Sequence, residues 1–339
     1  MENNTLVLLL NLGTPDAPTK SKVRTYLSQF LNDRRVIDIP YLSRKLLVNG
    51  IIVPFRTGNS TKIYKKVWTD EGSPLLLYTE SLTNKLREKF KGEADVEFAM
   101  RYQNPSMESV LLNAQKKNYK RIVVIPLYPQ YAASSSGSSL EEFYRIISKW
   151  WVIPEVQTIN QFFDDEDYLS ALMKTAEGFE AKDYDHVIMS YHGLPERQVD
   201  KVYNDGLCAD RDCEEELTRE NQYCYKAACY ATSREIAKRL NIPDDHYTVA
   251  FQSRLNDKWL KPFSDKVVEE KAKEGMKKLL VFSPAFTADC LETIYEIGEE
   301  YQEIFEEHGG EKVQLVPALN DNDYWVDALE AIIRKNSRI

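Results

Sequence analysis

Short apolar runs alternate with amphipathic segments along most of the chain. The apolar runs are typical of buried parallel strands, and they lie at 5–12, 96–100, 121–126, 187–192, 248–253, 278–283 and 313–316. Segments with helical spacing lie between or after them, at 21–30, 74–90, 107–117, 139–150, 167–179, 225–240, 263–273, 290–307 and 323–335. The repeated order of strand, polar loop and helix predicts an α/β fold with parallel sheets.

The alternation occurs in two halves, which meet at about residues 160–167. We expect two Rossmann-like, doubly wound domains, each with a parallel four-stranded sheet, facing each other across a cleft. The N-terminal domain spans 1–160 and the C-terminal domain spans 161–322. The closing helix, at about 323–339, is expected to pack back on the N-terminal domain.

The segment 41–56 departs from this pattern. Its apolar residues crowd together on both sides of Asn49 and Gly50, and basic residues flank them. Two interpretations stay open at this point. The segment is either an ordinary core helix, or an apolar lip at Leu46–Phe55 that covers a hydrophobic ligand or touches a membrane surface.

Composition and charge narrow the class of protein. The chain has 339 residues, 43% of them hydrophobic and 29% charged, and a net charge of −9. This charge argues against a nucleic-acid partner, which requires a basic face. Because the sequence has no apolar run of the ~18–20 residues that span a bilayer and no basic region of a signal peptide, we expect a cytoplasmic protein. A lip at 46–55 would add peripheral contact at the inner face of the membrane.

His192 is the first candidate for chemistry. It ends the apolar run at 187–192, and Gly193 and Pro195 then stop the strand. Open α/β sheets bind ligands beyond the carboxyl ends of their strands, where this imidazole would lie. A hydrogen-bonded structural histidine is the alternative, but the chain has only four histidines and a carboxylate-rich stretch follows about a hundred residues later.

That stretch carries Glu292, Glu296 and Glu300, spaced i, i+4 and i+8 after a predicted strand and turn. The spacing places them roughly along one side of a helix. Ordinary α geometry would let the row drift around the helix, and a local π-bulge would straighten it. A solvated acidic face is the alternative, although apolar neighbours favour a site. Desolvated carboxylates raise one another's pKa values, so the row suits a proton relay or the passage of a divalent cation.

Several segments, in order along most of the chain, resemble the ferrochelatase family, whose members insert ferrous iron into a porphyrin in heme synthesis. They are LLLNLGTPDAP at 8–18, FLNDRRVI at 30–37, EGSPLLLYT at 71–79, AMRYQNPS at 99–106, PLYPQYAASSSGSS at 126–139, SYHGLPER at 190–197, FQSRLNDKWLKP at 251–262 and TADCLETIYEIGEEY at 287–301. SYHGLPER is the signature of the family. Such a resemblance implies a lyase that inserts Fe²⁺ into protoporphyrin IX to make protoheme, the last step of heme biosynthesis.

The resemblance also implies the roles of particular residues. His192 and Glu292 would flank the iron on opposite sides of the porphyrin plane, with His192 either accepting pyrrole protons or binding the metal. Glu296 and Glu300 would continue a polar path from Glu292. The substrates are protoporphyrin IX and Fe²⁺, and the chemistry itself requires no cofactor.

The same resemblance implies porphyrin contacts, which fit the needs of a flat apolar ring with two propionates. The matching positions are Arg101, Tyr102, Tyr128 and, for the propionates, Arg34 or Arg35. The apolar segment 46–55 matches the lip through which the porphyrin enters. Two departures are Cys290, where the family often has histidine, and a segment around Trp259 that looks shortened.

Two other functions stay open. A chelatase for another tetrapyrrole, such as coproporphyrin III or a cobalt-accepting precursor, would have the same fold. A heme or metal carrier without catalysis would bind its product tightly and would not need the glutamate row.

Four cysteines lie close together beyond the signature histidine: Cys208, Cys213, Cys224 and Cys229. Their C-x4-C-x10-C-x4-C spacing indicates metal ligands, with wider pairs than in a zinc knuckle. Thiolate-only ligation suits an iron–sulfur cluster, and some ferrochelatases hold a [2Fe–2S] cluster on a similar internal set. A [2Fe–2S] cluster, zinc and unliganded thiols therefore stay open. We expect Cys224 to precede a helix and Cys229 to lie in its first turns.

Overall fold

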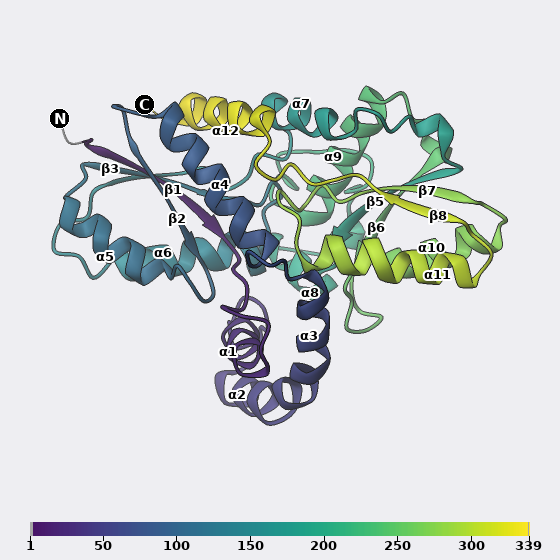
Figure 1. Ribbon diagram of the computed structural model, residues 1–339, viewed down its shortest axis with the longest axis horizontal. Coiled ribbons are helices and arrows are strands. Elements are labelled where there is room, and N and C mark those ends of the chain that lie inside the picture. Colours follow the sequence, from purple (N-terminus) through teal and green to yellow (C-terminus); the bar gives the residue numbers. More distant parts are fainter. Residues whose placement is uncertain (1–2, 338) are drawn as a thin grey trace. The chain divides into compact units, whose positions relative to one another are not determined.

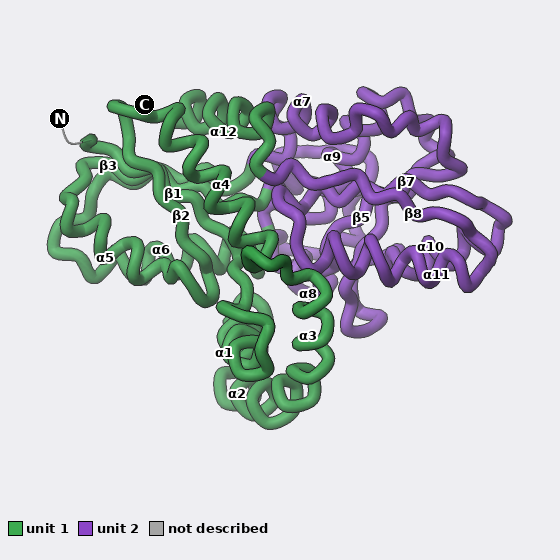
Figure 2. Tube along the Cα trace, in the orientation of Figure 1, with its two compact units in different colours: residues 1–128, 132–161, 321–339 green, residues 129–131, 162–320 purple. Residues whose placement is uncertain are grey.

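The computed structural model describes residues 3–337 and 339. The chain divides into two units, one formed by 1–128, 132–161 and 321–339, the other by 129–131 and 162–320 (Figure 2). Each unit contains one four-stranded parallel sheet, with strand orders β2-β1-β3-β4 and β6-β5-β7-β8. The predicted α/β class with two four-stranded parallel sheets is confirmed.

The sheet of the first unit consists of β1 (Thr5–Asn11), β2 (Asp95–Met100), β3 (Arg121–Pro126) and β4 (Glu155–Thr158). α5 (Met107–Lys117) and α6 (Ser138–Ile147) cover one face, and α4 (Pro74–Lys89) and α12 (Asp323–Asn336) lie on the other (Figure 1). On the first face, alternate leucines of β1 pack against Leu111 and Phe143. Because helices cover both faces, β1 and β3 are apolar at nearly every position.

The sheet of the second unit consists of β5 (His186–His192), β6 (Tyr247–Gln252), β7 (Lys278–Phe282) and β8 (Lys312–Leu315). α10 (Ser264–Lys273) and α11 (Gln302–Glu307) cover one face, where Val268 and Phe305 are buried against the strands. α7 (Glu166–Thr175) and α9 (Tyr225–Arg239) lie on the other face (Figure 1). The short α8 (Glu196–Val199) follows directly after β5 and its loop.

β4 is the strand that the apolar pattern did not locate. Its sequence is Glu-Val-Gln-Thr, and none of its four residues is fully buried. It pairs only with β3, so it forms an edge of the sheet and has no need of an apolar run.

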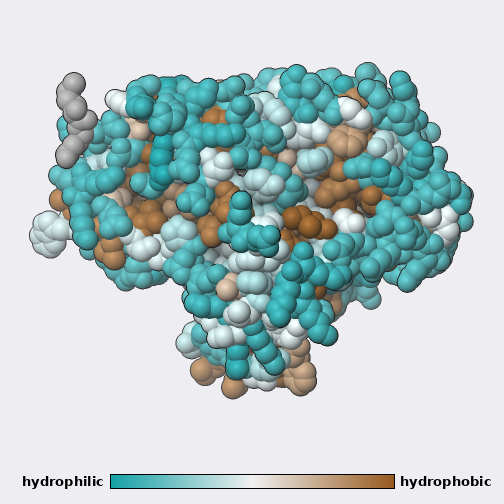
Figure 3. All heavy atoms as spheres, in the orientation of Figure 1, coloured by the Kyte–Doolittle hydropathy of each residue, from teal (hydrophilic) through white to brown (hydrophobic). Residues whose placement is uncertain are grey.

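Residues 41–67 form a bent helical segment: α2 (Tyr41–Leu47), a π-helix (Val48–Ile52) and α3 (Val53–Val67), which packs against α1 (Lys20–Leu31). Val48 and Val53 are buried, but Leu46 is 75% exposed and Phe55 is 83% exposed. The interpretation of this segment as an ordinary core helix is therefore wrong for most of its apolar side chains. Figure 3 shows apolar atoms gathered at the tip that α2 forms in this unit.

No helix in the described part of the chain combines the length and apolarity needed to cross a bilayer.

Candidate functional site

His192 is the last residue of β5, at the carboxyl edge of the second sheet. Its Nδ1 atom lies 2.7 Å from the carbonyl oxygen of Gly193. A carbonyl oxygen can only accept a hydrogen bond, so Nδ1 carries the ring proton and Nε2 of the neutral imidazole carries the lone pair. Nε2 is thus the atom that can take a proton or bind a metal.

The loop after β5 fixes the position of this imidazole. The Tyr225 hydroxyl donates to the His192 carbonyl at 2.9 Å, and the Gly193 amide donates to the Gln252 carbonyl at 2.8 Å. A Cβ atom on Gly193 would lie 2.7 Å from that Gln252 oxygen, so only glycine allows the loop to approach β6 this closely. The Trp259 ring lies 6.5 Å from the imidazole, centroid to centroid, so the segment that looked shortened still reaches His192.

Gln252 connects His192 to the glutamate row. It ends β6, pairs with His192 across the two strands, and is 1% exposed. Its amide nitrogen donates to the Glu292 carbonyl at 3.2 Å and to a Glu296 carboxylate oxygen at 3.1 Å, while its Oε1 accepts from Ser190 at 2.8 Å. Sequence reasoning did not single out Gln252. Its signal is a polar residue at the end of a buried strand, immediately beside the strand that carries the histidine.

Glu292, Glu296 and Glu300 lie on a ten-residue π-helix, Glu292–Tyr301, which leads into α11. In an α-helix a step of four residues overshoots one turn by about 40°, so the row would drift. The wider turn of a π-helix counters this drift. The π geometry expected as a local bulge therefore extends over the whole row.

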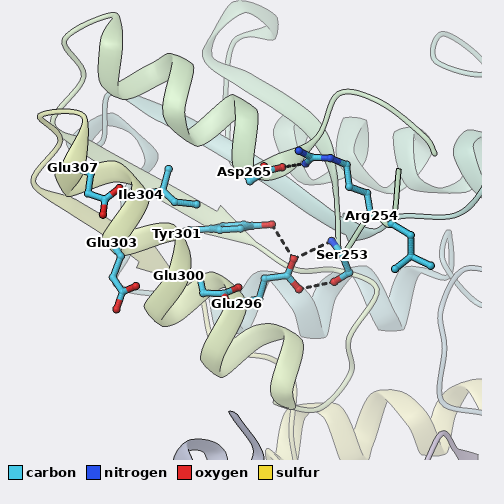
Figure 4. A pocket seen from close by; sticks show the side chains of 10 residues that line it. Ser253, Arg254, Asp265, Glu296, Glu300, Tyr301, Glu303, Ile304 and Glu307 are labelled. Carbon is cyan, nitrogen blue, oxygen red and sulfur yellow. Dashed lines mark hydrogen bonds and ion pairs between the residues drawn. The ribbon is translucent and has the colours of Figure 1, made fainter. Parts of the chain in front are cut away.

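Glu296 and Glu300 face one cavity of about 540 Å³ (Figure 4). The side chains that line it are Ser253, Arg254, Leu255, Asp265, Glu296, Glu300, Tyr301, Glu303, Ile304 and Glu307. The guanidinium of Arg254 forms an ion pair with Asp265, which leaves the four glutamates to set the charge of the cavity. A cavity with this lining attracts cations.

Glu296 has the most constrained carboxylate of the row. It accepts hydrogen bonds from the Ser253 amide at 2.9 Å, from the Ser253 hydroxyl and from Gln252. Burial raises its pKa above the usual value, although the Ser253 hydroxyl and the charge of a protonated His192 both lower it. Glu296 and His192 are thus electrostatically linked, and burial makes Glu296 easier to protonate than an exposed carboxylate.

Cys290 is buried at the start of this helix, and its amide donates to the Thr293 hydroxyl at 3.0 Å. Burial, and next the Glu292 carboxylate, raise the pKa of this thiol well above its usual value. Cys290 is therefore a neutral thiol rather than a reactive thiolate.

Arg101 and Tyr102 lie in the first unit and meet at Asp33. Arg101 forms an ion pair with the Asp33 carboxylate at 2.6 Å, and the Tyr102 hydroxyl donates to the same oxygen at 2.9 Å. Burial raises the pKa of Asp33, but hydrogen bonds from Ser138 and from the Arg35 amide, and the Arg101 charge, bring it below the usual value. The sequence did not single out Asp33, because its role depends on partners about 70 residues away.

Arg34 and Arg35 both pair with Glu141 on α6, and the Arg34 side chain is 69% exposed. The Tyr128 hydroxyl, just after β3, is buried and has no hydrogen-bond partner of normal geometry among the described residues. Burial raises the pKa of Tyr128, so the group is a neutral hydroxyl. A buried hydroxyl in this state can donate to a ligand or to water.

Three of the four loop cysteines converge. The sulfur atoms of Cys208, Cys213 and Cys224 all lie within 4.8 Å of one another, with separations of 3.7 Å for Cys208–Cys213 and 3.6 Å for Cys208–Cys224. All are buried and none is in a disulfide. Cys224 caps α9 and Cys229 lies in the second turn of that helix, as predicted, but Cys229 does not belong to the converging set.

Comparison with known proteins gives consistent matches. The sequence profile of the ferrochelatase family matches residues 4–337. The chain is 41% identical over 336 residues to the ferrochelatase of Coxiella burnetii (strain Dugway 5J108-111), covering 98% of this chain and 94% of that one. It is 40% identical over 330 residues to the ferrochelatase of Legionella pneumophila (strain Lens), covering 97% and 98%.

Among solved structures, the chain resembles SirB from Bacillus subtilis with Fe³⁺, with a TM-score of 0.55, 12% identity and coverage of 98% and 95%. It also resembles SirB from Bacillus subtilis subspecies spizizenii in complex with cobalt, described as a sirohydrochlorin chelatase, with a TM-score of 0.53, 13% identity and coverage of 99% and 96%. At these identities the likeness concerns the fold alone.

Proposed function

Because the chain belongs to the ferrochelatase family, we propose that it is a metal chelatase that inserts Fe²⁺ into protoporphyrin IX, in heme biosynthesis. The observation that carries this proposal is the connection of His192 to the glutamate row through Gln252, within one unit. A metal-binding or proton-accepting imidazole next to a line of carboxylates is what the reaction requires.

The reaction exchanges two pyrrole protons for one metal ion. His192 Nε2 accepts a proton from the porphyrin or binds the iron, and Glu292 acts from the opposite side of the ring. The cavity lined by Glu296 and Glu300 supplies Fe²⁺ and carries protons away, since burial raises the pKa of Glu296 and makes it a better proton acceptor than an exposed carboxylate. Two protons leave for each Fe²⁺ that enters, so the charge of the site is restored after each turnover.

The porphyrin-binding residues are proposed to be Arg34, Tyr102 and Tyr128, with Arg101 as a residue that positions them. Arg34 is the exposed member and is the candidate for a propionate. Arg101 is already paired with Asp33, so it acts by holding Tyr102 in place. The Tyr128 hydroxyl, which is buried and has no hydrogen-bond partner of normal geometry in the described part of the chain, is the candidate for a direct contact.

An insertion assay with a panel of substrates tests the substrate. Fe²⁺ with protoporphyrin IX should give the highest kcat/KM, ahead of coproporphyrin III and of a cobalt-accepting precursor. Preference for either of the others would change the proposed substrate within the same reaction class. Tight binding of heme with no insertion of any metal would instead identify a carrier.

Substitution of the two central residues tests the mechanism. His192→Ala should lower kcat by about 10²–10⁴-fold, because it removes the proton acceptor, while porphyrin binding is retained. Glu292→Gln should likewise remove most of the activity. His308→Ala is a matched control, since this histidine follows the last residue of α11 and contacts the Ile304 carbonyl and the Glu269 carboxylate, neither of which belongs to the proposed site. Normal turnover in His192→Ala would contradict the assignment.

The cysteine loop has the donor chemistry of an iron–sulfur site. Cys208, Cys213 and Cys224 are buried, close together and unoxidised, which fits thiolate ligation. Hydrogen bonds from the other two thiols lower the pKa of Cys213, which is the direction that thiolate ligation requires. We propose that these residues hold a [2Fe–2S] cluster, with Cys229 as the fourth ligand. The cluster would supply a redox-active or structural centre and takes no part in the insertion step above.

Serine variants test this cluster. The anaerobically purified protein should show visible absorption and two iron and two sulfide per chain, and Cys213→Ser should lose both. Cys229→Ser should do the same if Cys229 is the fourth ligand, and should keep the cluster if another group takes that place. A colourless protein that contains zinc, or no metal, would reject the cluster.

A further inference from the structure

The inference that follows rests on the proposed iron–sulfur cluster and concerns a residue next to it. The Tyr203 hydroxyl lies 3.1 Å from the sulfur of Cys213. A metal-bound thiolate has no proton, so it can only accept this hydrogen bond. A phenol has a usual pKa near 10 and keeps its proton at neutral pH, which makes Tyr203 the donor.

The phenol is held in place by Arg211. The guanidinium carbon of Arg211 lies 4.0 Å from the centre of the Tyr203 ring, which is the distance of a stacked cation–π contact. Arg211 in turn donates to the carbonyls of Leu207 at 2.9 Å and Asp205 at 2.8 Å, and forms an ion pair with Glu220 at 2.6 Å. Its side chain is only 15% exposed. Arg211 is therefore bonded to several residues of the cysteine loop and holds the Tyr203 ring in place.

Cys213 has two polar side chains of the loop, Tyr203 and Asn221, within reach of its sulfur. The amide of Asn221, itself buried, lies 3.9 Å from the Cys213 sulfur and also donates to the Glu216 carbonyl at 2.9 Å. The phenol contact is shorter and belongs to the stronger donor of the two. The loop therefore directs two side-chain donors at the Cys213 sulfur, while the Cys224 sulfur accepts from the Ala227 amide and lies within reach of the same phenol.

We propose that Tyr203 is a hydrogen-bond donor to the Cys213 thiolate that raises the reduction potential of the cluster, and that Arg211 positions it. Reduction adds one electron to the cluster and makes its sulfur ligands more negative. A hydrogen bond to a ligand sulfur stabilises the reduced form more than the oxidised form. No proton needs to be transferred in this step, because the phenol only polarises the sulfur.

Tyr203→Phe is the test, made on the full chain purified without oxygen. The variant should keep wild-type iron and sulfide content, and its midpoint potential in a redox titration should be more negative. Tyr223→Phe is the matched control, because this tyrosine lies in the same loop, next to Cys224, and is 45% exposed. Its potential should equal that of the wild type.

Arg211→Lys is the second variant, because it leaves the phenol and removes its stacked, multiply bonded partner. Its midpoint potential should shift in the same direction as that of Tyr203→Phe, by a smaller amount. If Tyr203→Phe does not assemble a cluster, the potential of Arg211→Lys alone tests the role of Tyr203. An intact cluster with an unchanged potential in both variants would overturn the role of Tyr203 and leave the cluster standing. A wild-type protein without iron or sulfide would overturn the cluster and this inference together.

Discussion

At the scale of single residues, the site depends on where protons reside on His192 and Glu296. The Gly193 carbonyl fixes the proton of the imidazole on Nδ1, so Nε2 is available for the porphyrin or the iron. Glu296 has a raised pKa, and the hydroxyl of Ser253 is the first of the contacts that lower it again. A carboxylate binds a cation only when ionised, so activity should fall as the pH decreases through the pKa of Glu296.

Substitution of Ser253 tests whether its hydroxyl sets the pKa of Glu296. Ser253 has a φ of 62°, a conformation that glycine adopts without strain. Ser253→Gly and Ser253→Ala both remove the hydroxyl, so both should raise the pKa of Glu296 and move the acidic limb of the pH profile of kcat/KM for Fe²⁺ to higher pH. Ser253→Ala should also be less stable than Ser253→Gly by about 1–2 kcal/mol in urea unfolding, because the Cβ atom of an L-residue is strained at positive φ and glycine has no Cβ atom.

If the acidic limb stays in place in both variants, the Ser253 hydroxyl does not set the protonation of Glu296. Equal stability of the two variants would contradict the strain argument alone.

The sequence predicted His192 and the glutamate row because both carry local signals: a polar residue at the end of an apolar run, and a spacing of four. Gln252 also ends a buried strand, but the sequence does not show which strand lies beside it, and Asp33 carries no local signal. Each is defined by partners that are distant in the chain, Glu296 for one and Arg101 for the other. The convergence of Cys208, Cys213 and Cys224, without Cys229, likewise depends on the path of the loop and not on the spacing of the cysteines.

At the scale of elements, local pattern predicted the buried strands and missed features that depend on the neighbours of an element. β4 is a polar edge strand, and its pairing with β3 cannot be recognised from its own four residues. The segment 41–67 has an apolar composition that suits either a core or a surface, and only the packing of α3 on α1 decides which side chains remain outside. We propose that this exposed apolar lip, 46–55, touches the membrane surface.

Vesicle binding tests the lip. The double variant Leu46→Asp/Phe55→Asp should lose binding to vesicles of anionic lipid in a sedimentation assay, because it places two charges where apolar side chains would enter the headgroup region. Leu112→Asp is the control, since Leu112 is also an exposed apolar residue of the same unit, but lies on α5. Equal loss in the control would indicate a general charge effect, and equal binding by all three proteins would exclude the lip as a membrane contact.

At the scale of the whole molecule, the charge of the chain and the charge of the cavity favour the same substrate. The net charge is −9, and the cavity that holds Glu296 and Glu300 is lined at its exposed end by Glu303 and Glu307. Such a field raises the local concentration of a divalent cation and repels anions. The two propionates of a porphyrin would be repelled by the same field, so local cations such as Arg34 have to offset it.

The rate of iron capture should therefore depend on salt. Raising the ionic strength shortens the screening length from about 10 Å at 0.1 M to about 3 Å at 1 M, so kcat/KM for Fe²⁺ should fall steadily over this range. Glu303→Gln/Glu307→Gln removes the two exposed charges of the cavity and should flatten this dependence, with kcat at saturating iron nearly unchanged. A variant with a matched loss of charge elsewhere, such as Glu177→Gln/Glu180→Gln in the loop after α7, should keep the wild-type slope. Because both variants lose two charges, equal slopes in the two would mean that net charge alone attracts the iron, while a flatter slope in the cavity variant would identify this cavity as the route of entry.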